Sequence, residues 1–351
     1  MAAATVESVP PGGSHETDVI IVGAGPCGLF AVFELGLLGV KAHLIDILDK
    51  PGGQAAELYP EKPILDIPAI KSITGEQLTR QLLDQIEPFG AKFHMNEMAV
   101  SLDKTPEGKW TIATDLGTKI TAPVIVVAAG GGSFQPKKPP IPGVDDFEGR
   151  SVFYAVRERE AFRDKNIVIA GGGDSALDWT LNLQPIAKSV TLIHRRPDFR
   201  AAPDSVEKMH ALANAEKIDF QVAQIKGLKG AEGRISAVSV ESNEGGAYDI
   251  PCDTLLAFYG LTMKLGPIAE FGLNLTENRI EVDTEKFETS VPGIFCIGDM
   301  AWYPGKLKLI LSGFHEAALM SHGAFHYVFP DKKLKFQHTT SAKDLQAQVG
   351  N

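Results

Sequence analysis

The chain has 351 residues, of which 44% are hydrophobic and 22% are charged. A chain of this length usually exceeds one hydrophobic core, and its apolar content excludes disorder of the whole chain. The net charge of -10 repels polyanions, which argues against nucleic acid and anionic membrane surfaces as general partners. We therefore expect a globular protein of two domains.

The chain then shows two β-α-β patterns. Residues 1–17 are rich in Ala, Pro, Gly and Ser and predict a flexible tail without a secretory signal, so a cytoplasmic location is expected. The first pattern has a strand at 18–22, a helix at 26–38 and a strand at 40–45, and the second has these elements at 166–170, 174–183 and 189–194.

The segments that follow each β-α-β pattern also correspond. Short strand patterns follow the first unit at 99–101, 110–114 and 119–128, and the second unit at 220–223, 235–241 and 254–257. A proline-rich stretch at 135–143 indicates a crossing between domains. A strand at 294–297 and a helix at 313–328 complete the first module if they rejoin it. The prediction is an α/β fold of two Rossmann-type dinucleotide-binding domains. Each has a three-layer ββα arrangement, and the second domain is inserted in the first.

A glycine-rich turn at residues 23–28 follows the first strand and opens the first helix. It contains Gly23, Gly25, Pro26, Cys27 and Gly28. Its glycines permit a tight turn and a close approach of pyrophosphate, and the helix N-terminus offers amide donors and a positive dipole end. Asp46 ends the next strand, where a carboxylate accepts hydrogen bonds from ribose hydroxyls. The first module is therefore expected to bind a dinucleotide with an unphosphorylated ribose.

A second glycine-rich turn lies at residues 171–176, and the β-α-β unit that contains it ends in basic residues where the first unit ends in an acidic one. Its candidate cofactor-binding residues are Gly171, Gly173, Asp174, Ser175 and Ala176. Arg195 and Arg196 occupy the position that Asp46 has in the first module, and guanidinium groups bind a ribose 2′-phosphate where a carboxylate repels it. Arg200 either closes the same phosphate site or is a solvated surface charge. The pattern favours NADPH over NADH, and two such modules imply hydride transfer to a bound flavin.

Several motifs together give a more specific resemblance. They are the two glycine-rich turns, Pro-Gly-Gly-Gln at 51–54, Tyr-Pro-Glu-Lys at 59–62, His-Arg-Arg at 194–196, and Cys-Ile-Gly-Asp at 296–299. Over residues 18–341 the chain resembles the thioredoxin-reductase-like ferredoxin–NADP reductases. The resemblance implies an FAD-binding domain at 18–134 and 290–331, an NADPH-binding domain at 135–289, and a C-terminal extension over the flavin at 332–351.

The resemblance also assigns site residues. Tyr59 would stack on one face of the flavin and His338 on the other, with Phe336 as the rival to His338. The further cofactor-binding residues are Gln54, Phe134, Asp299 and Thr339. The helix near Gly313 would direct its positive end at the flavin, and Glu316 is expected only to decorate its first turn.

The cysteines separate this chain from thioredoxin reductases, which carry a redox-active Cys-x-x-Cys. Cys27, Cys252 and Cys296 are far apart in sequence, which excludes that motif and suggests no metal site. The resemblance implies a homodimer that passes electrons from NADPH to ferredoxin or flavodoxin, which needs no thiol. An NADPH-dependent reductase of a quinone, dioxygen or another acceptor and a redox-sensing flavoprotein are the alternatives.

An acidic reductase needs a local basic surface to bind an acidic ferredoxin. The candidate lysines are Lys137, Lys138, Lys306, Lys308, Lys332, Lys333 and Lys335. Such clusters are also common on ordinary solvated faces.

Overall fold

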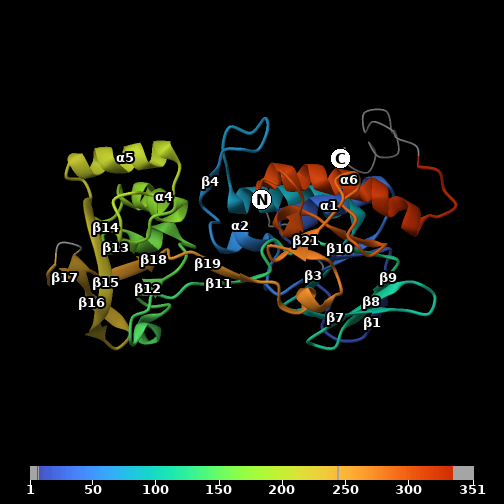
Figure 1. Ribbon diagram of the computed structural model, residues 1–351, viewed down its shortest axis with the longest axis horizontal. Helices are drawn as coiled ribbons and strands as arrows, with labels where there is room; N and C mark the ends of the chain where they lie inside the picture. The colour runs from blue at the N-terminus through green and yellow to red at the C-terminus, as the bar shows by residue number, and fades with distance from the viewer. Residues whose placement is uncertain (1–5, 7, 243–244, 335–351) are drawn as a thin grey trace. The chain divides into compact units, whose positions relative to one another are not determined.

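The computed structural model describes residues 6, 8–242 and 245–334 and divides the chain into two compact units (Figure 1). Unit 1 comprises Met1–Ser133 and Met263–Asn351, and unit 2 comprises Phe134–Thr262. The second unit is inserted in the first. Residues 263–289, expected in the insertion, belong instead to unit 1 because they join its core: Ile280 is fully buried there, and its strand pairs with residues 301–302.

The centre of unit 1 is a five-stranded parallel sheet with the order β22-β10-β2-β3-β6. Its strands are short, and β2 and β10 consist only of Val and Ile and are buried along their whole length. Such continuous apolar runs are typical of parallel strands covered on both faces. The strands are β2 (Val19–Val22), β3 (Ala42–Asp46), β6 (Lys92–Met95), β10 (Val124–Val127) and β22 (Ile294–Cys296).

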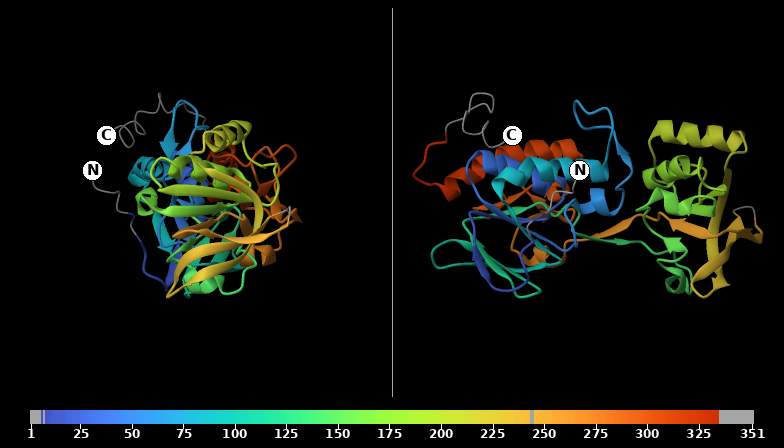
Figure 2. Two further views of the ribbon diagram at one scale, coloured as in Figure 1. Left: turned by 90° about the vertical axis from the view of Figure 1, so that its left-hand side faces the viewer. Right: turned by 180° about the vertical axis from the view of Figure 1, so that it is seen from behind.

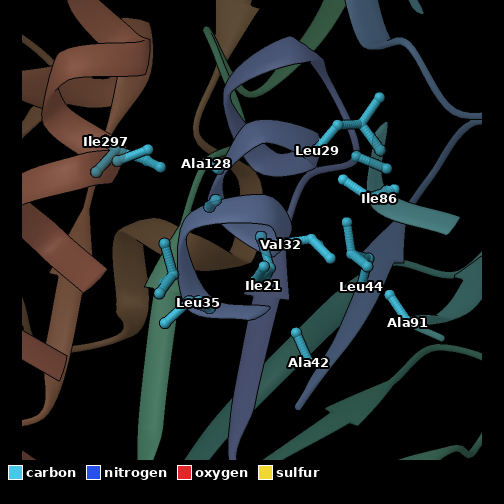
Figure 3. Packing of buried hydrophobic residues seen from close by; sticks show 14 of the residues in the cluster. Ile21, Leu29, Val32, Leu35, Ala42, Leu44, Ile86, Ala91, Ala128 and Ile297 are labelled. Carbon is cyan, nitrogen blue, oxygen red and sulfur yellow. The ribbon is translucent and has the colours of Figure 1, made fainter. Parts of the chain in front are cut away.

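Helices cover one face of this sheet and an antiparallel meander covers the other, which gives three layers (Figure 1). Val19 and Ile21 of β2 join the core on the helix side, whereas Ile20 and Val22 join the core under the meander. Figure 3 shows helix-side residues, with Leu29, Val32 and Leu35 of α1 around Ile21. The helices are α1 (Pro26–Leu37), α3 (Gly75–Ile86) and α6 (Ile310–Val328), and the meander is β7 (Ala99–Lys104), β8 (Trp110–Thr114) and β9 (Lys119–Ala122).

The N-terminal segment differs from the expected flexible tail. Strand β1 (Ser14–Glu16) pairs in parallel with the edge strand β9. The amide of Gly12 also donates to Thr118 Oγ1 at 2.7 Å, and the amide of Val9 donates to the carbonyl of Phe93. The open edge of β9 supplies unpaired backbone groups, so residues 8–17 are built into unit 1.

Unit 2 repeats the plan with one continuous seven-stranded sheet. Its order is β12-β18-β13-β14-β15-β16-β17, and the long strand β15 is parallel to β14 through residues 219–222 and antiparallel to β16 from Ala223 onward. Helices α4 (Asp174–Leu183) and α5 (Pro203–Asn214) lie together on one side of this sheet (Figure 2). The strands are β12 (Val152–Phe153), β13 (Asn166–Ala170), β14 (Ser189–His194), β15 (Asp219–Ala231), β16 (Arg234–Ser242), β17 (Ala247–Pro251) and β18 (Thr254–Ala257).

The remaining elements are short. They are α2 (Gly53–Glu57), β4 (Pro63–Ile64), β5 (Ile73–Thr74), β11 (Ser133–Pro136), β19 (Leu261–Lys264), β20 (Leu275–Thr276), β21 (Arg279–Glu281), β23 (Ala301–Trp302), and 3-10 turns at Glu87–Phe89, Val144–Phe147, Arg159–Phe162, Gly266–Glu270 and Gly298–Met300. Within the described ranges, none of the helices combines the length and the apolar character needed to cross a bilayer.

Candidate functional site

The first glycine-rich turn joins β2 to α1 under tight steric limits. Gly23 has a φ of +110°, and a Cβ there would lie 2.4 Å from the carbonyl oxygen of Ala128. A Cβ at Gly28 would lie 2.0 Å from the carbonyl oxygen of Gly23. Gly25 is different, because it is the N-cap of α1 in extended conformation and its Cβ position has only Gly53 Cα nearby, at 3.8 Å. The turn thus presents open backbone at the positive end of a helix, which suits a phosphate group.

Asp46 at the end of β3 lies against this turn. One carboxylate oxygen accepts a hydrogen bond from the amide of Ala24 at 2.6 Å, and the other accepts one from the amide of Leu48 at 2.9 Å. Burial raises the pKa of Asp46, and the two amides oppose that shift. The carboxylate is therefore held in a fixed orientation beside the turn, with lone pairs left for further donors.

The Pro-Gly-Gly-Gln segment closes over the same turn. The amide of Gly52 donates to the carbonyl of Ala24 at 2.8 Å, and a Cβ at Gly53 would lie 2.9 Å from Gly25 Cα. Both Gly52 and Gly53 have positive φ. Gln54 reaches the carboxyl end of β10, where its amide nitrogen lies 3.5 Å from the Cβ position of Gly130. Local glycine geometry thus brings Gln54 to the first turn.

Tyr59 follows α2 and is partly buried. Burial, with the charge of Asp299 acting in the same direction, raises the pKa of its phenol to about 12. The phenol is therefore neutral at physiological pH. Asp299 and Cys27 are both close enough to raise this pKa, so Tyr59 lies near the carboxyl ends of the unit 1 strands.

The start of α6 meets the start of α1 at Gly298. Gly298 has a φ of +74° and follows β22, and its Cβ position lies 3.2 Å from Cys27 Sγ. A Cβ at Gly313, in the second turn of α6, would lie only 2.1 Å from the same sulfur. Two helix N-termini and the Gly298–Asp299 turn therefore converge, and their amides and dipoles favour an anionic or electron-rich group.

Sequence reasoning missed a buried ion pair at this junction. The side chain of Lys306 is 1% exposed and forms an ion pair with Glu316, whose side chain is fully buried. Glu316 was expected to decorate the first helical turn and Lys306 to lie on a docking surface, so both interpretations were wrong. The helical spacing of Gly313, Glu316 and Met320 indicated that Glu316 lies on the buried face of α6, so its burial could have been predicted from the sequence.

The second glycine-rich turn repeats the first in unit 2. A Cβ at Gly171 would lie 2.7 Å from the carbonyl oxygen of Phe258 and 2.9 Å from Cβ of Ala176, which is fully buried. A Cβ at Gly172 would collide with the ring of His194 at 2.2 Å. Gly173 is the extended N-cap of α4, and its Cβ position has only the Arg200 carbonyl oxygen nearby, at 3.9 Å. Open backbone again lies at a helix N-terminus.

The segment after β14 is tied to this turn. The amide of Arg200 donates to the carbonyl of Gly172 at 2.7 Å, and Asp174 accepts a hydrogen bond from the amide of Ala202 at 2.8 Å. These bonds hold residues 195–202 beside the start of α4. Arg195, Arg196 and Arg200 are exposed there, as is Ser175 in the first turn of α4. The side chain of Asp174 thus positions the arginine segment, a role that its sequence position does not reveal.

His194 is partly buried, and its ring stacks on Phe199 with centroids 5.3 Å apart. Burial lowers its pKa, and Arg195 and Arg196 act in the same direction. The neutral ring therefore supports the glycine turn.

The remaining predicted site residues fall outside what the structure describes. His338 and Thr339, with the rival Phe336, lie beyond the described residues, and the side chain of Phe134 is likewise outside them.

Comparisons with known proteins agree with this geometry. A family model described as pyridine nucleotide-disulphide oxidoreductase matches residues 17–321. The chain belongs to this family. Among curated oxidoreductases, "Ferredoxin--NADP reductase" of Parvibaculum lavamentivorans is 64% identical over 95% of this chain and 97% of its own length. The protein of that name from Mesorhizobium japonicum is 61% identical over 96% and 98%.

Solved structures similar to this chain have the same fold. Thioredoxin reductase of Lactococcus lactis superposes with a TM-score of 0.75 at 25% identity, covering 90% of this chain and 99% of that chain. The thioredoxin reductase of T. acidophilum gives 0.74 at 23% identity over 88% and 98%. The resemblance inferred from the motifs and the α/β fold of two Rossmann-type units are both confirmed.

The cysteines of this family member are unsuited to disulphide chemistry. All three are free, and burial raises the pKa of Cys27 and of Cys252 to about 12 and that of Cys296 in the same direction. Neutral thiols are poor nucleophiles. Electron transfer by this protein would therefore follow a route that needs no cysteine pair.

Proposed function

We propose that this chain is an FAD-dependent ferredoxin–NADP⁺ reductase that binds FAD on unit 1 and NADPH on unit 2. The observation that carries this proposal is the pair of glycine turns with opposite partners: a fixed carboxylate, Asp46, beside the first, and an arginine segment tied to the second. The curated relatives carry the name ferredoxin–NADP reductase at 59–64% identity over nearly the whole chain.

Unit 1 fits an FAD molecule at its strand ends. The amides that open α1 would bind the pyrophosphate, and Gly25 leaves space there that a Cβ would fill. Asp46 would accept from the adenosine ribose, Asp299 would bind near the ribityl chain, and Gln54 and Tyr59 would line the flavin end. Bound FAD accepts two electrons as hydride and releases them one at a time.

Unit 2 fits NADPH by the same logic. The amides of Gly173, Asp174 and Ser175 at the start of α4 would bind pyrophosphate, and Gly171 and Ala176 allow the close helix packing. Arg195 and Arg196 would bind the 2′-phosphate, with Arg200 closing the site because its backbone is fixed against Gly172.

The finer predictions from the sequence extend this proposal. His338 with Thr339 over the second flavin face, Phe134 as a cofactor contact, a homodimer, flavodoxin as an alternative carrier and a cytoplasmic location stay predictions. Fewer lysines remain as docking candidates, because Lys306 is buried and Lys138 pairs with Asp145 and Glu148. Lys137, Lys308, Lys332 and Lys333 remain exposed candidates, and Lys335 lies outside the described residues.

Anaerobic reduction tests the proposal directly. The purified protein is expected to be yellow, to bleach on addition of NADPH, and to regain its flavin absorbance when oxidised ferredoxin is added. Parallel additions of flavodoxin, a quinone and dioxygen distinguish the alternative acceptors. A protein that takes up no flavin, or a reduced flavin that ferredoxin does not reoxidise, contradicts the proposal.

A further inference from the structure

Unit 1 contains a deeply buried lysine–glutamate pair, Lys306 and Glu316, with side-chain exposures of 1% and 0%. One carboxylate oxygen of Glu316 accepts from Lys306 Nζ and from the Tyr303 hydroxyl, the latter at 2.8 Å. The other accepts from the amide of Gly298 at 2.6 Å. Lys306 Nζ also lies 5.5 Å from the ring centroid of Tyr303. Glu316 therefore joins three segments: the end of β22, the loop after β23 and helix α6.

The amide that Glu316 binds belongs to the residue before Asp299. Gly298 is in a left-handed conformation and packs against Cys27, and Gly313, one turn before Glu316, packs against the same sulfur. The carboxylate thus fixes the turn that carries Asp299 and, through its own helix, the N-terminus of α6. Both features lie beyond the carboxyl end of β22, where the flavin end of FAD is proposed to bind.

Stability alone is a poor reason for such a pair. Removing two charges from water costs several kcal/mol per ion, and well-packed apolar residues often serve as well or better. A buried charge does, however, act over several ångströms in a low-dielectric interior. Burial is the main reason that the pKa values of Cys27 and Cys296 are raised, and Glu316 adds to that shift whereas Lys306 opposes it.

We propose that Lys306 and Glu316 are a positioning pair that fixes the Gly298–Asp299 turn against helix α6 and balances the charge at the flavin. This inference rests on the proposed flavin site in unit 1. Other titratable groups near the pair are Tyr303, Cys27 and Cys296, whereas His315 beside Glu316 is exposed. Asp299 follows the Gly298 amide that Glu316 binds.

The test is the midpoint potential of the flavin in the holoenzyme, measured between pH 6 and pH 9. Lys306→Met leaves Glu316 as an uncompensated buried acid. At high pH, the affinity of this variant for reduced flavin relative to oxidised flavin should fall about tenfold, which lowers the midpoint potential. The potential should also show a new pH-dependent step where Glu316 protonates. Glu316→Gln leaves Lys306 uncompensated and should raise the potential. The double variant should return close to wild type.

Lys208→Met is the matched control, because Lys208 also pairs with an acid, Asp204, but both side chains are more than half exposed. Its flavin potential should equal that of wild type. A purely structural pair would lower flavin content or thermal stability without a new pH-dependent step.

Wild-type potentials and pH slopes in both single variants would overturn the inference. If Lys306→Met does not fold, Glu316→Gln decides alone, since its carbonyl oxygen still accepts a hydrogen bond at this junction and its expected shift is upward. A wild-type protein without flavin would instead refute the proposed function and, with it, the role of the pair. The two failures are therefore distinguishable.

Discussion

Gly25→Ala should separate flavin binding from folding. Gly25 has a φ of -74°, which alanine adopts freely, and the nearest atom to a Cβ there is Gly53 Cα at 3.8 Å. Contact at that distance is ordinary, and alanine also restricts the unfolded chain. The free energy of unfolding of the flavin-free protein should therefore change by less than about 1 kcal/mol.

Flavin affinity should respond much more strongly to the same methyl group. It would lie over the amides that open α1, where the pyrophosphate of FAD is expected. A lost hydrogen bond to a charged group costs about 1.5 to 3 kcal/mol, which weakens FAD binding about ten- to a hundredfold. Gly23→Ala should differ, because its φ of +110° and the 2.4 Å approach to Ala128 strain the fold by about 2 kcal/mol or more.

Two measurements decide the matter. Urea unfolding of the flavin-free proteins gives stability, and titration of FAD by fluorescence quenching gives affinity. Gly227→Ala in β15 is the control, since its Cβ would meet Ser239 at an ordinary 3.6 Å far from the glycine turns in sequence. If Gly25→Ala binds FAD as tightly as wild type, the pyrophosphate does not lie on this turn.

Three further predictions follow from the remaining residues. Arg195→Ala should lower the ratio of kcat/KM for NADPH to that for NADH about ten- to a hundredfold, and an unchanged ratio would remove Arg195 from the 2′-phosphate site. Tyr59→Ala should shift the flavin absorption bands, whereas Tyr59→Phe should leave them unchanged up to about pH 9, because the pKa of the phenol is raised to about 12. Burial and the neighbouring His94, His15 and Lys92 lower the pKa of His43 to about 4. The unfolded form of His43 binds a proton first, so the free energy of unfolding should fall as pH drops from 6.5 to 4, by about 1 to 2 kcal/mol because partial solvent exposure screens the shift. His43→Gln should flatten that fall in urea unfolding.

The elements next to the glycine turns were predictable because local chemistry determines them. The expected helix at 174–183 matches α4 at both ends, and the expected helix at 26–38 ends one residue beyond α1. Each begins where an extended glycine N-cap follows an apolar strand. Helix α6 begins at Ile310, three residues before the expected start, because no glycine or capping side chain marks its N-cap Leu309.

Other features depend on tertiary contacts that no local pattern encodes. The pairing of β1 with β9 depends on a meander edge about a hundred residues away. The return to unit 1 at Met263 rather than near residue 290 depends on Ile280 entering a distant core. Helix α3 was missed although Thr74 and Gln77 form a capping box, so that omission had a readable signal.

The buried pair illustrates why the site was harder to predict than the fold. The glycine turns are recognisable from the spacing of their glycines between an apolar strand and a helix, although the atoms that exclude a Cβ at Gly23 and Gly171 belong to the distant residues Ala128 and Phe258. Lys306 and Glu316 carry the residue types of a solvated surface, and only the meeting of β22, the loop after β23 and α6 buries them. A loop lysine such as Lys306 therefore cannot be assigned to the surface or to the interior until its packing partner is known. Charges that act on a cofactor through the backbone are consequently the part of such a site that sequence reasoning finds last.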